Sequence, residues 1–328
     1  MGKRPMRFKG ARTTCTHLFL TAVQADKVIR VRSERTLFLA ICSIDRARAC
    51  LHHRTQFGSS CQTHRTVHKA PLLAHGESMG HHKVVMVTGA AQGIGRATAE
   101  KFLAQGWQVL AIDQQAEGLA TLQSAAPTQV TTLVLDVTGQ DAPAQAMALA
   151  KQRFGRLDAL INNAGIGKSK AVHETTDAEL DRFYAINLRS VFRFSREALG
   201  LMESGACMVH VASTFGLVGN PVASSYAATK AALMGLTRQM AVDYGPKGIR
   251  INAVAPGVIH TPLTEARLGD AAFRRLMVNT TPFPRIGTPQ DVAGAIHFLC
   301  SEDAGFVNGH VLVIDGGWSA TNSVGTPD

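Results

Sequence analysis

The chain contains no apolar run approaching the roughly 18 residues that a membrane-spanning helix requires, and its mean hydropathy is only +0.04. Aromatic residues make up 6% and charged residues 18% of the 328 positions. The low mean hydropathy and the lack of a long apolar run exclude a transmembrane helix. What the chain does contain is 45% hydrophobic residues, enough for a sizeable core, and 30 glycines, which indicate many tight turns. Such a length and composition suit one large α/β domain or two small ones.

Most of the chain also lacks the excess of positive charge that the total suggests. The formal net charge is +10, which by itself favours a nucleic-acid or membrane partner. Residues 1–78, however, hold 14 of the 34 Lys and Arg but only 4 of the 24 Asp and Glu. Residues 79–328 keep 20 residues of each sign and are neutral. We therefore expect neither a nucleic-acid nor a membrane partner.

Residues 1–78 are predicted to be a basic, disordered extension ahead of a folded domain at 79–328, or else a mis-assigned start, with Met79 as the true first residue. The segment lacks the ordered parts of a secretory signal, and an organelle transit segment is the alternative. A zinc site with neighbouring histidines is conceivable, although no CxxC pair is present. The cysteines of this segment are Cys15, Cys42, Cys50 and Cys61.

The folded part begins with a pattern typical of a nucleotide-binding βαβ unit. Val84–Val87 is a β-branched run that predicts a buried strand, and the Gly-rich segment Thr88–Gly95 follows at once. A helical stretch at 96–105 and a second strand at 108–112 come next, and the strand ends in Asp113. This order predicts a dinucleotide site, because a strand, a Gly-rich turn, a helix, a second strand and an acidic residue follow one another within about 30 residues.

Each residue type in this unit has a physical reason. Gly89 allows a tight turn, Gly93 lets a pyrophosphate approach the backbone, and Gly95 lets the helix pack closely on the sheet. The spacing is GxxxGxG rather than the generic GxGxxG, so the turn alone is a weak signal. Asp113 strengthens it, because a carboxylate there accepts hydrogen bonds from the ribose hydroxyls and repels a 2′-phosphate. The pattern therefore favours NAD(H) over NADP(H).

Three further predicted strands end in polar or small residues. They are followed by Asp136, by Asn162-Asn163-Ala164-Gly165 and by Ser213. Ligands of open α/β sheets bind at the carboxyl ends of the strands, so these residues are expected to line one cleft. The alternation predicts a single doubly wound α/β domain of the Rossmann type with a parallel sheet.

Tyr226 and Lys230 stand four residues apart in a helical stretch and would share one helix face. A phenol of ordinary pKa near 10 is a poor acid at neutral pH, and an ammonium group beside it would lower that pKa. Such a tyrosine can exchange a proton with a carbonyl or alcohol oxygen. Ser213, on a strand end, can donate a hydrogen bond to the same oxygen.

Together these motifs resemble the short-chain dehydrogenase/reductase family, in its roughly 250-residue form, from Lys83 to about Ala320. The resemblance implies that Tyr226 is the catalytic acid/base, that Ser213 orients and polarises the substrate oxygen, and that Lys230 binds the nicotinamide ribose and lowers the tyrosine pKa. It also implies that Asn187 holds a water that links Lys230 to solvent. The motifs that carry it include Thr88-Gly89, Gly93-Ile94-Gly95, Asp136, Asn162 to Gly165, Asn187, Ser213, Tyr226, Lys230, Pro256-Gly257 and Asp315-Gly316-Gly317.

The same resemblance implies the cofactor contacts. Asp136 is expected at the adenine, Asn163 and Gly165 at the sheet and the adenosine side, and Ile259 and Thr261 at the nicotinamide carboxamide. The full implied set is Gly89, Gln92, Gly93, Ile94, Gly95, Asp113, Asp136, Val137, Asn163, Ala164, Gly165, Tyr226, Lys230, Pro256, Gly257, Ile259 and Thr261. No metal is expected.

The function that follows is an NAD(H)-dependent interconversion of a secondary alcohol and a ketone. A 3-oxoacyl-thioester (acyl-carrier-protein) reductase and a non-catalytic dinucleotide-binding regulator remain alternatives. The resemblance also implies a cytoplasmic homo-oligomer, either a tetramer or a dimer. The segment Pro262–Pro284 is expected to form a short helical lid, His210 to be a hydrogen-bonded core residue, and Cys207 and Cys300 to be buried thiols.

Overall fold

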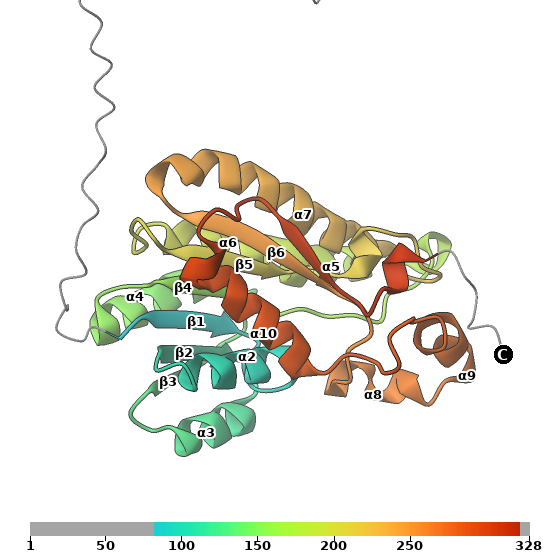
Figure 1. The fold of residues 1–328 in the computed structure, drawn as a ribbon, viewed down its shortest axis with the longest axis horizontal. Helices are drawn as coiled ribbons and strands as arrows, with labels where there is room; N and C mark the ends of the chain where they lie inside the picture. The colour runs from blue at the N-terminus through green and yellow to red at the C-terminus, as the bar shows by residue number, and fades with distance from the viewer. Residues whose placement is uncertain (1–81, 322–328) are drawn as a thin grey trace, which may run out of the picture. The chain divides into compact units, whose positions relative to one another are not determined.

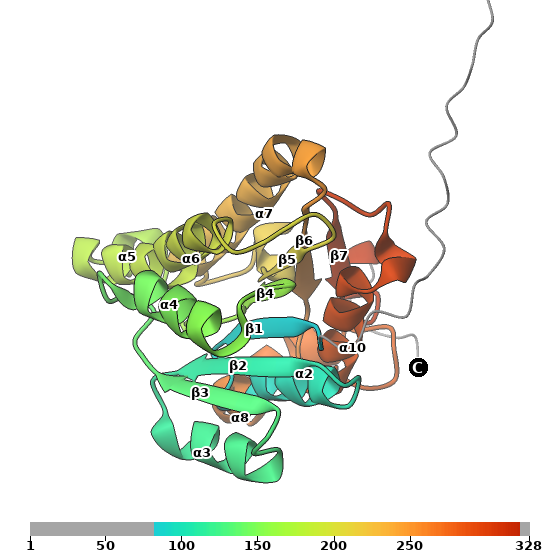
Figure 2. The same cartoon turned by 90° about the vertical axis from the view of Figure 1, so that its left-hand side faces the viewer.

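The computed structural model describes residues 82–321, which form one parallel sheet covered by helices on both faces (Figures 1 and 2). The strand order is β3-β2-β1-β4-β5-β6-β7. Strands β2 and β3 are added on one side of β1, and β4 and the later strands are added on its other side. The order of strand addition thus reverses between β1 and β4, and sheets of this kind bind ligands at such a switch point. The strands are β1 (Val84–Thr88), β2 (Gln108–Asp113), β3 (Val130–Val134), β4 (Ala159–Asn162), β5 (Cys207–Val211), β6 (Arg250–Pro256) and β7 (Val311–Ile314).

The helices bury the two faces of the sheet in separate apolar clusters. One cluster joins α2, α3 and α10 to alternate strand residues such as Val85 and Val109, and the other joins α4, α6 and α7 to residues such as Met86 and Leu110. Strands buried on both faces explain the nearly continuous apolar runs in the sequence. The helices are α2 (Gly93–Leu103), α3 (Ala116–Ala125), α4 (Ala142–Phe154), α5 (Asp177–Tyr184), α6 (Ser190–Ala198), α7 (Ser224–Tyr244), α8 (Pro262–Leu268), α9 (Ala271–Phe273) and α10 (Pro289–Cys300).

The predicted doubly wound α/β fold is confirmed, with small differences at element ends. Helix α2 begins at Gly93 rather than at Arg96, so part of the Gly-rich turn is already its first turn. The third strand runs over Val130–Val134 and so ends two residues before Asp136, which was expected to follow its end directly. Ends shift in this way because strand ends depend on pairing with neighbours, which a local pattern does not contain.

Segment 262–284 is helical as predicted, with α8 and α9 followed by the single π-turn η5 (Arg274–Val278). Within residues 82–321, no helix combines the length and apolar character needed to cross a bilayer. The predictions for residues 1–78, namely disorder, a start at Met79, a transit segment or a zinc site, concern residues outside the described range.

Candidate active site

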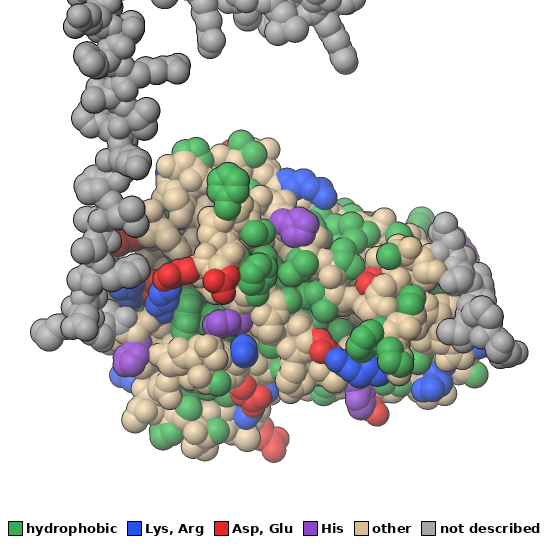
Figure 3. Space-filling model, in the orientation of Figure 1, with side chains coloured by type: hydrophobic (Ala, Val, Ile, Leu, Met, Phe, Trp, Pro, Cys, Tyr) green, Lys and Arg blue, Asp and Glu red, His purple; other side chains and the backbone are tan. Residues whose placement is uncertain are grey.

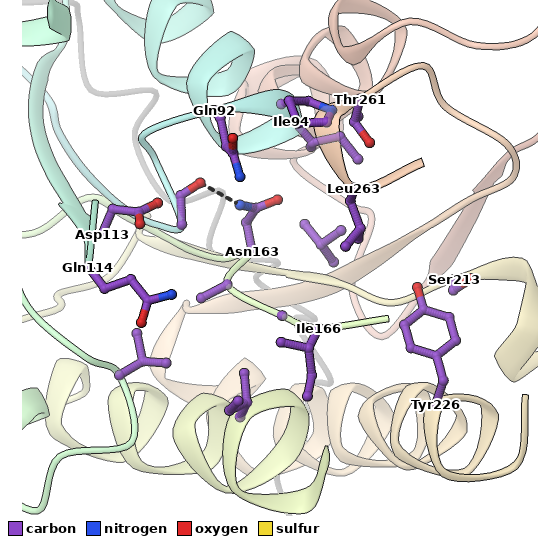
Figure 4. Close-up of a pocket in the computed structure, with 18 of the residues that line it drawn as sticks. Gln92, Ile94, Asp113, Gln114, Asn163, Ile166, Ser213, Tyr226, Thr261 and Leu263 are labelled. Atoms are coloured by element: carbon purple, nitrogen blue, oxygen red, sulfur yellow. Dashed lines mark hydrogen bonds between the residues drawn. The ribbon is translucent and has the colours of Figure 1, made fainter. Parts of the chain in front are cut away.

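A cavity of about 640 Å³ opens at the carboxyl ends of the strands (Figure 4). Its lining includes every residue predicted for the site except Gly95 and Asn187, which lie behind it. Asp113, at the end of β2, and Tyr226, on α7, mark its two ends in Figure 4. The predicted residues therefore share one space although they come from most of the chain.

The Gly-rich turn at the N-terminus of α2 requires glycine at two of its positions. Gly89 has a left-handed φ of +69°, and a Cβ built on Gly95 would lie 2.0 Å from the carbonyl oxygen of Gly89. Gly95 thus has a packing role, as the helix-against-turn argument predicts. Asn163 ties the turn to the end of β4, because its Nδ2 donates to the carbonyl oxygens of Thr88 at 2.9 Å and Gly89 at 3.0 Å.

Asp113 is held rigidly at one end of the cavity. Only 9% of the residue is exposed. Its Oδ2 accepts the backbone N–H of Ala91 at 3.0 Å, and its Oδ1 accepts that of Gln115 at 3.0 Å. Each oxygen keeps a further lone pair for a ligand hydroxyl. Asp136 also lines the cavity, but it is exposed, and its Oδ1 accepts two hydrogen bonds from Thr138, each of 2.8 Å.

At the opposite end, Tyr226, Ser213 and Lys230 meet. Figure 4 places the side chains of Ser213 and Tyr226 next to each other, and the Ser213 hydroxyl acts to lower the Tyr226 pKa. One helical turn further along α7, the Nζ of Lys230 lies 5.6 Å from the centroid of the Tyr226 ring and donates to the carbonyl oxygen of Val211 at 2.7 Å. This arrangement can move a proton to or from an oxygen bound beside the phenol.

The tyrosine pKa differs from the sequence expectation. Burial raises the pKa of Tyr226 above its ordinary 10, and the hydrogen bond from Ser213 and the charge of Arg267 oppose that rise. The expected lowering by Lys230 is not observed, because its ammonium group is directed at Val211 and burial lowers its own pKa to about 8. The structure thus identifies Arg267, on α8, as a cation near the phenol.

Asn187 is fully buried in η2 (Ala185–Arg189), a π-helical turn between α5 and α6. Its Oδ1 accepts the N–H of Ile166 at 2.8 Å and its Nδ2 donates to the carbonyl oxygen of Ile166 at 3.0 Å. A Cβ on Gly165 would lie 3.2 Å from Asn187 Oδ1 and 3.4 Å from Lys230 Nζ. Gly165 therefore borders the Tyr226 end of the cavity, not the Asp113 end where the resemblance put it.

Comparison with known proteins decides the family. Residues 89–319 match the family model described as Enoyl-(Acyl carrier protein) reductase. Levodione reductase of Leifsonia aquatica is 41% identical over 254 residues, which cover 73% of this chain and 94% of that protein. The chain belongs to the short-chain dehydrogenase/reductase family.

Two further relatives of this short-chain dehydrogenase support the assignment. The 3-oxoacyl-[acyl-carrier-protein] reductase of Thermotoga maritima is 38% identical over 240 residues, which cover 72% of this chain and 97% of that protein. The crystallised 4-hydroxyisoleucine dehydrogenase complexed with NADH superposes with a TM-score of 0.68 at 32% identity, covering 74% of this chain and all of that one. The residues matched by the family model, 89–319, lie within the part of the chain that the structure describes.

Several cavity residues of the short-chain dehydrogenase were missed by sequence reasoning. Gln114 and Gln115 directly follow the end of β2, so the strand-end rule could have found them. Arg182 comes from helix α5, where nothing in the local pattern indicates which face meets a cavity. Pro262, Leu263 and Thr264 belong to the segment predicted as a lid, and the other lining residues were missed: Gln114, Gln115, Leu135, Thr138, Ile166, Arg182, Ala185, Ile186, Val211 and Ala212.

His210 lies behind the site as a buried core residue, which confirms the prediction made for it. Thr237 donates its hydroxyl hydrogen to the carbonyl oxygen of Leu233 at 2.7 Å, so it accepts from His210 Nδ1 at 3.0 Å. His210 Nε2 is then the acceptor for Ser195 Oγ at 3.4 Å, which in turn accepts from Asn162. The neutral imidazole thus joins β4, β5, α6 and α7.

We expect this histidine to make the short-chain dehydrogenase sensitive to acid. Burial lowers the pKa of His210 to about 4, below the unfolded value near 6.5. The unfolded chain therefore takes up a proton that the folded chain refuses, so the stabilisation is complete above pH 6.5 and is lost as the pH falls toward 4. Urea unfolding should show a loss of up to about 3 kcal/mol across this window.

His210→Asn removes the titrating group and should flatten this dependence, whereas His173→Asn, at an exposed position of η1 (Val172–Glu174), should leave it unchanged. An acid-induced loss of the same size in wild type and His210→Asn would assign it to other groups.

Proposed function

We propose that this short-chain dehydrogenase interconverts a secondary alcohol and a ketone by hydride transfer with NAD(H), using Tyr226 as the acid/base. The observation that carries the proposal is the contact of the Tyr226 hydroxyl with Ser213, beside Lys230 in the same cavity as Asp113. The names of relatives, levodione reductase among them, support the same reaction class.

The residues present fit a dinucleotide. Gly89 and Gly93 have left-handed φ values that leave the turn open to phosphate oxygens, and Asp113 keeps lone pairs for ribose hydroxyls. Lys230 satisfies one of its three N–H donors on Val211, which leaves others for a ribose hydroxyl at the Tyr226 end. When bound, the nicotinamide supplies or accepts the hydride.

In the direction of reduction, the chain's own groups handle the oxygen and its proton. The Tyr226 hydroxyl donates its proton to the substrate oxygen, and Ser213 stabilises that oxygen and the resulting phenolate by hydrogen bonding. Lys230 donates to the carbonyl oxygen of Val211 and would bind the ribose of the cofactor beside the phenol. Asn187 acts as a positioning residue, since it fixes the backbone of Ile166 at the cavity wall.

Preference for NAD(H) over NADP(H) is part of the proposal. A carboxylate at the end of β2 accepts ribose hydroxyl hydrogens and repels a 2′-phosphate. The nearby cation Arg96 is engaged elsewhere, since its Nε donates to Glu100 at 2.6 Å and its Nη1 donates to the carbonyl oxygen of Gly118 at 3.2 Å. Arg96 is therefore poorly placed to neutralise the 2′-phosphate of NADP(H).

A 3-oxoacyl-thioester reductase is the second candidate, favoured by the similarity to the Thermotoga maritima reductase. The preference expected from Asp113 argues against it if that reaction uses NADPH. A dinucleotide-binding regulator without turnover is less well supported, because both Tyr226 and Lys230 are retained.

A cytoplasmic homo-oligomer, a tetramer or a dimer, is also proposed. Hydrophobic side chains gather over β7 and α10 (Figure 3), where Phe298, Phe306 and Val313 are exposed. The unpaired thiols Cys207 and Cys300 suit a reducing compartment. Light scattering of the purified protein tests the assembly.

The test of the reaction is a screen of secondary alcohols and ketones against purified protein with NAD(H) and NADP(H) in parallel. We expect turnover of at least one alcohol–ketone pair, with NAD(H) preferred. Turnover restricted to 3-oxoacyl thioesters would instead select the second candidate. Dinucleotide binding without any turnover across the panel would favour the regulator.

A further inference from the structure

The lid carries a cation close to the hydroxyl that exchanges the proton. Arg267 lies on α8, three and four residues after Thr264 and Leu263, which line the cavity. Residues with these spacings share a helix face. The charge of Arg267 also acts directly on the Tyr226 hydroxyl. Arg267 is thus a half-buried residue of the lid, on the helix face of two residues that line the cavity.

The acidic groups of the lid have hydrogen-bond partners of their own, although the charge of Arg267 contributes to the lowered pKa of Asp270. Among residues 82–321, no carboxylate lies within ion-pair distance of Arg267. Asp270, whose pKa is lowered mainly by two backbone N–H groups of α9, accepts those groups at 2.7 and 3.0 Å. Glu265 is hydrogen-bonded to His260 at 2.5 Å. Arg267 keeps its donors available for a ligand.

The guanidinium of Arg267 instead stacks on the aromatic ring of Phe273. Its central carbon lies 4.3 Å from the centroid of the Phe273 ring, a cation–π contact between α8 and α9. Stacking of this kind orients the plane of the guanidinium while the N–H donors at its edge stay free. A planar cation fixed in this way is well suited to a bidentate anion.

The cavity itself is divided by charge. The only acidic residues in its lining are Asp113 and Asp136, which follow β2 and β3 on one half of the sheet. The basic residues of the lining are Lys230, beside Tyr226, and Arg182, on α5. The end around Tyr226 therefore has a cation in its lining and no carboxylate.

We propose that Arg267 binds an anionic group of the substrate, so that the enzyme acts on hydroxy or oxo compounds that carry a carboxylate, sulfonate or phosphonate near the reacting carbon. This inference rests on the proposed alcohol–ketone reaction. Leu263 faces Ile166 across the cavity (Figure 4), and its Cδ2 lies 3.7 Å from the position of a Cβ on Gly167. These residues would contact the carbons between the anion and the reacting centre.

The experiment compares ketones that differ only in charge. Acetoacetate is paired with acetoacetamide and 4-oxopentanoate with 4-oxopentanamide, and 2-oxopropylphosphonate and 2-oxopropanesulfonate distinguish the kinds of anion. We expect wild type to prefer at least one anion over its neutral partner by about tenfold or more in kcat/KM, as for a lost charge-assisted hydrogen bond. Arg267→Gln should remove this preference, so that each anion and its neutral partner react with equal kcat/KM.

Matched control variants distinguish a specific contact of Arg267 with the substrate anion from a general effect of positive charge on the protein. Arg275→Gln changes the same charge at an exposed position of η5 and should behave as wild type, and Arg267→Lys should keep part of the preference. Acetate, methanesulfonate and methylphosphonate should inhibit neutral-ketone reduction, with inhibition constants about tenfold weaker in Arg267→Gln.

Equal rates for anion and amide in wild type, or an anion preference that survives Arg267→Gln, would overturn the inference. In that case, continued reduction of the amides leaves the proposed function intact. Failure of wild type to reduce any neutral or anionic ketone would reject the proposed function as well.

Discussion

Tyr226→Phe should lower kcat by about two to four orders of magnitude while NADH still binds. The substitution removes one oxygen and leaves the ring, so its edge-on contact with Phe215, at 6.1 Å between centroids, can remain. What is lost is the phenolic hydroxyl beside Ser213 in the cavity. Ser213 alone can polarise the oxygen by hydrogen bonding, but an aliphatic hydroxyl is too weak an acid to transfer its proton at neutral pH.

Tyr244→Phe, at the far end of the same helix, is the matched control and should retain wild-type kcat. NADH fluorescence titration measures the binding of cofactor, and single-turnover kinetics measures the reaction itself. Activity of Tyr226→Phe near the wild-type level would mean that another group exchanges the proton and that the assignment of this site is wrong.

Asp113→Ser should shift the ratio of kcat/KM values for NAD and NADP by about two orders of magnitude toward NADP. The wild-type carboxylate is 9% exposed and is fixed by the N–H groups of Ala91 and Gln115, so it cannot turn away from a 2′-phosphate. Serine removes the repulsion and one pair of acceptors for the ribose hydroxyls. Both changes act on the ratio in the same direction.

Asp136→Ser is the control, because it removes another carboxylate of the cavity that is exposed and already hydrogen-bonded to Thr138. It should affect NAD and NADP alike. Thermal unfolding shows whether Asp113→Ser, which loses an acceptor for one backbone N–H, still folds. An unchanged cofactor ratio in a folded Asp113→Ser protein would mean that this carboxylate does not contact the ribose.

The parts of the site that could be read from the chain are those made by short segments. A Gly-rich turn between a strand and a helix, an acid at the next strand end, and a tyrosine four residues before a lysine all carry their geometry in their spacing. The positions of Gly89, Asp113, Tyr226 and Lys230 follow from strand and helix periods alone, because backbone geometry within a few residues is nearly fixed.

Contacts between distant segments could not be read in this way. Arg267 belongs to a short helix between β6 and α10, and its distance from Tyr226 depends on how that helix folds back over the cavity. Likewise, the hydrogen bonds of Asn187 to the backbone of Ile166, made from a π-helical turn, were not indicated by any spacing in the sequence. The spacing of residues within one helix or strand does not indicate such contacts between distant segments.

The order of residues alone thus settled the doubly wound fold and the position of the phenol, since burial of apolar runs and helix spacing are local properties. Folding in three dimensions settled the sign of the shift in the Tyr226 pKa and the charge at the substrate end. Both depend on desolvation and on charges brought together from segments far apart in the chain, and those energies exist only once the surrounding atoms are in place.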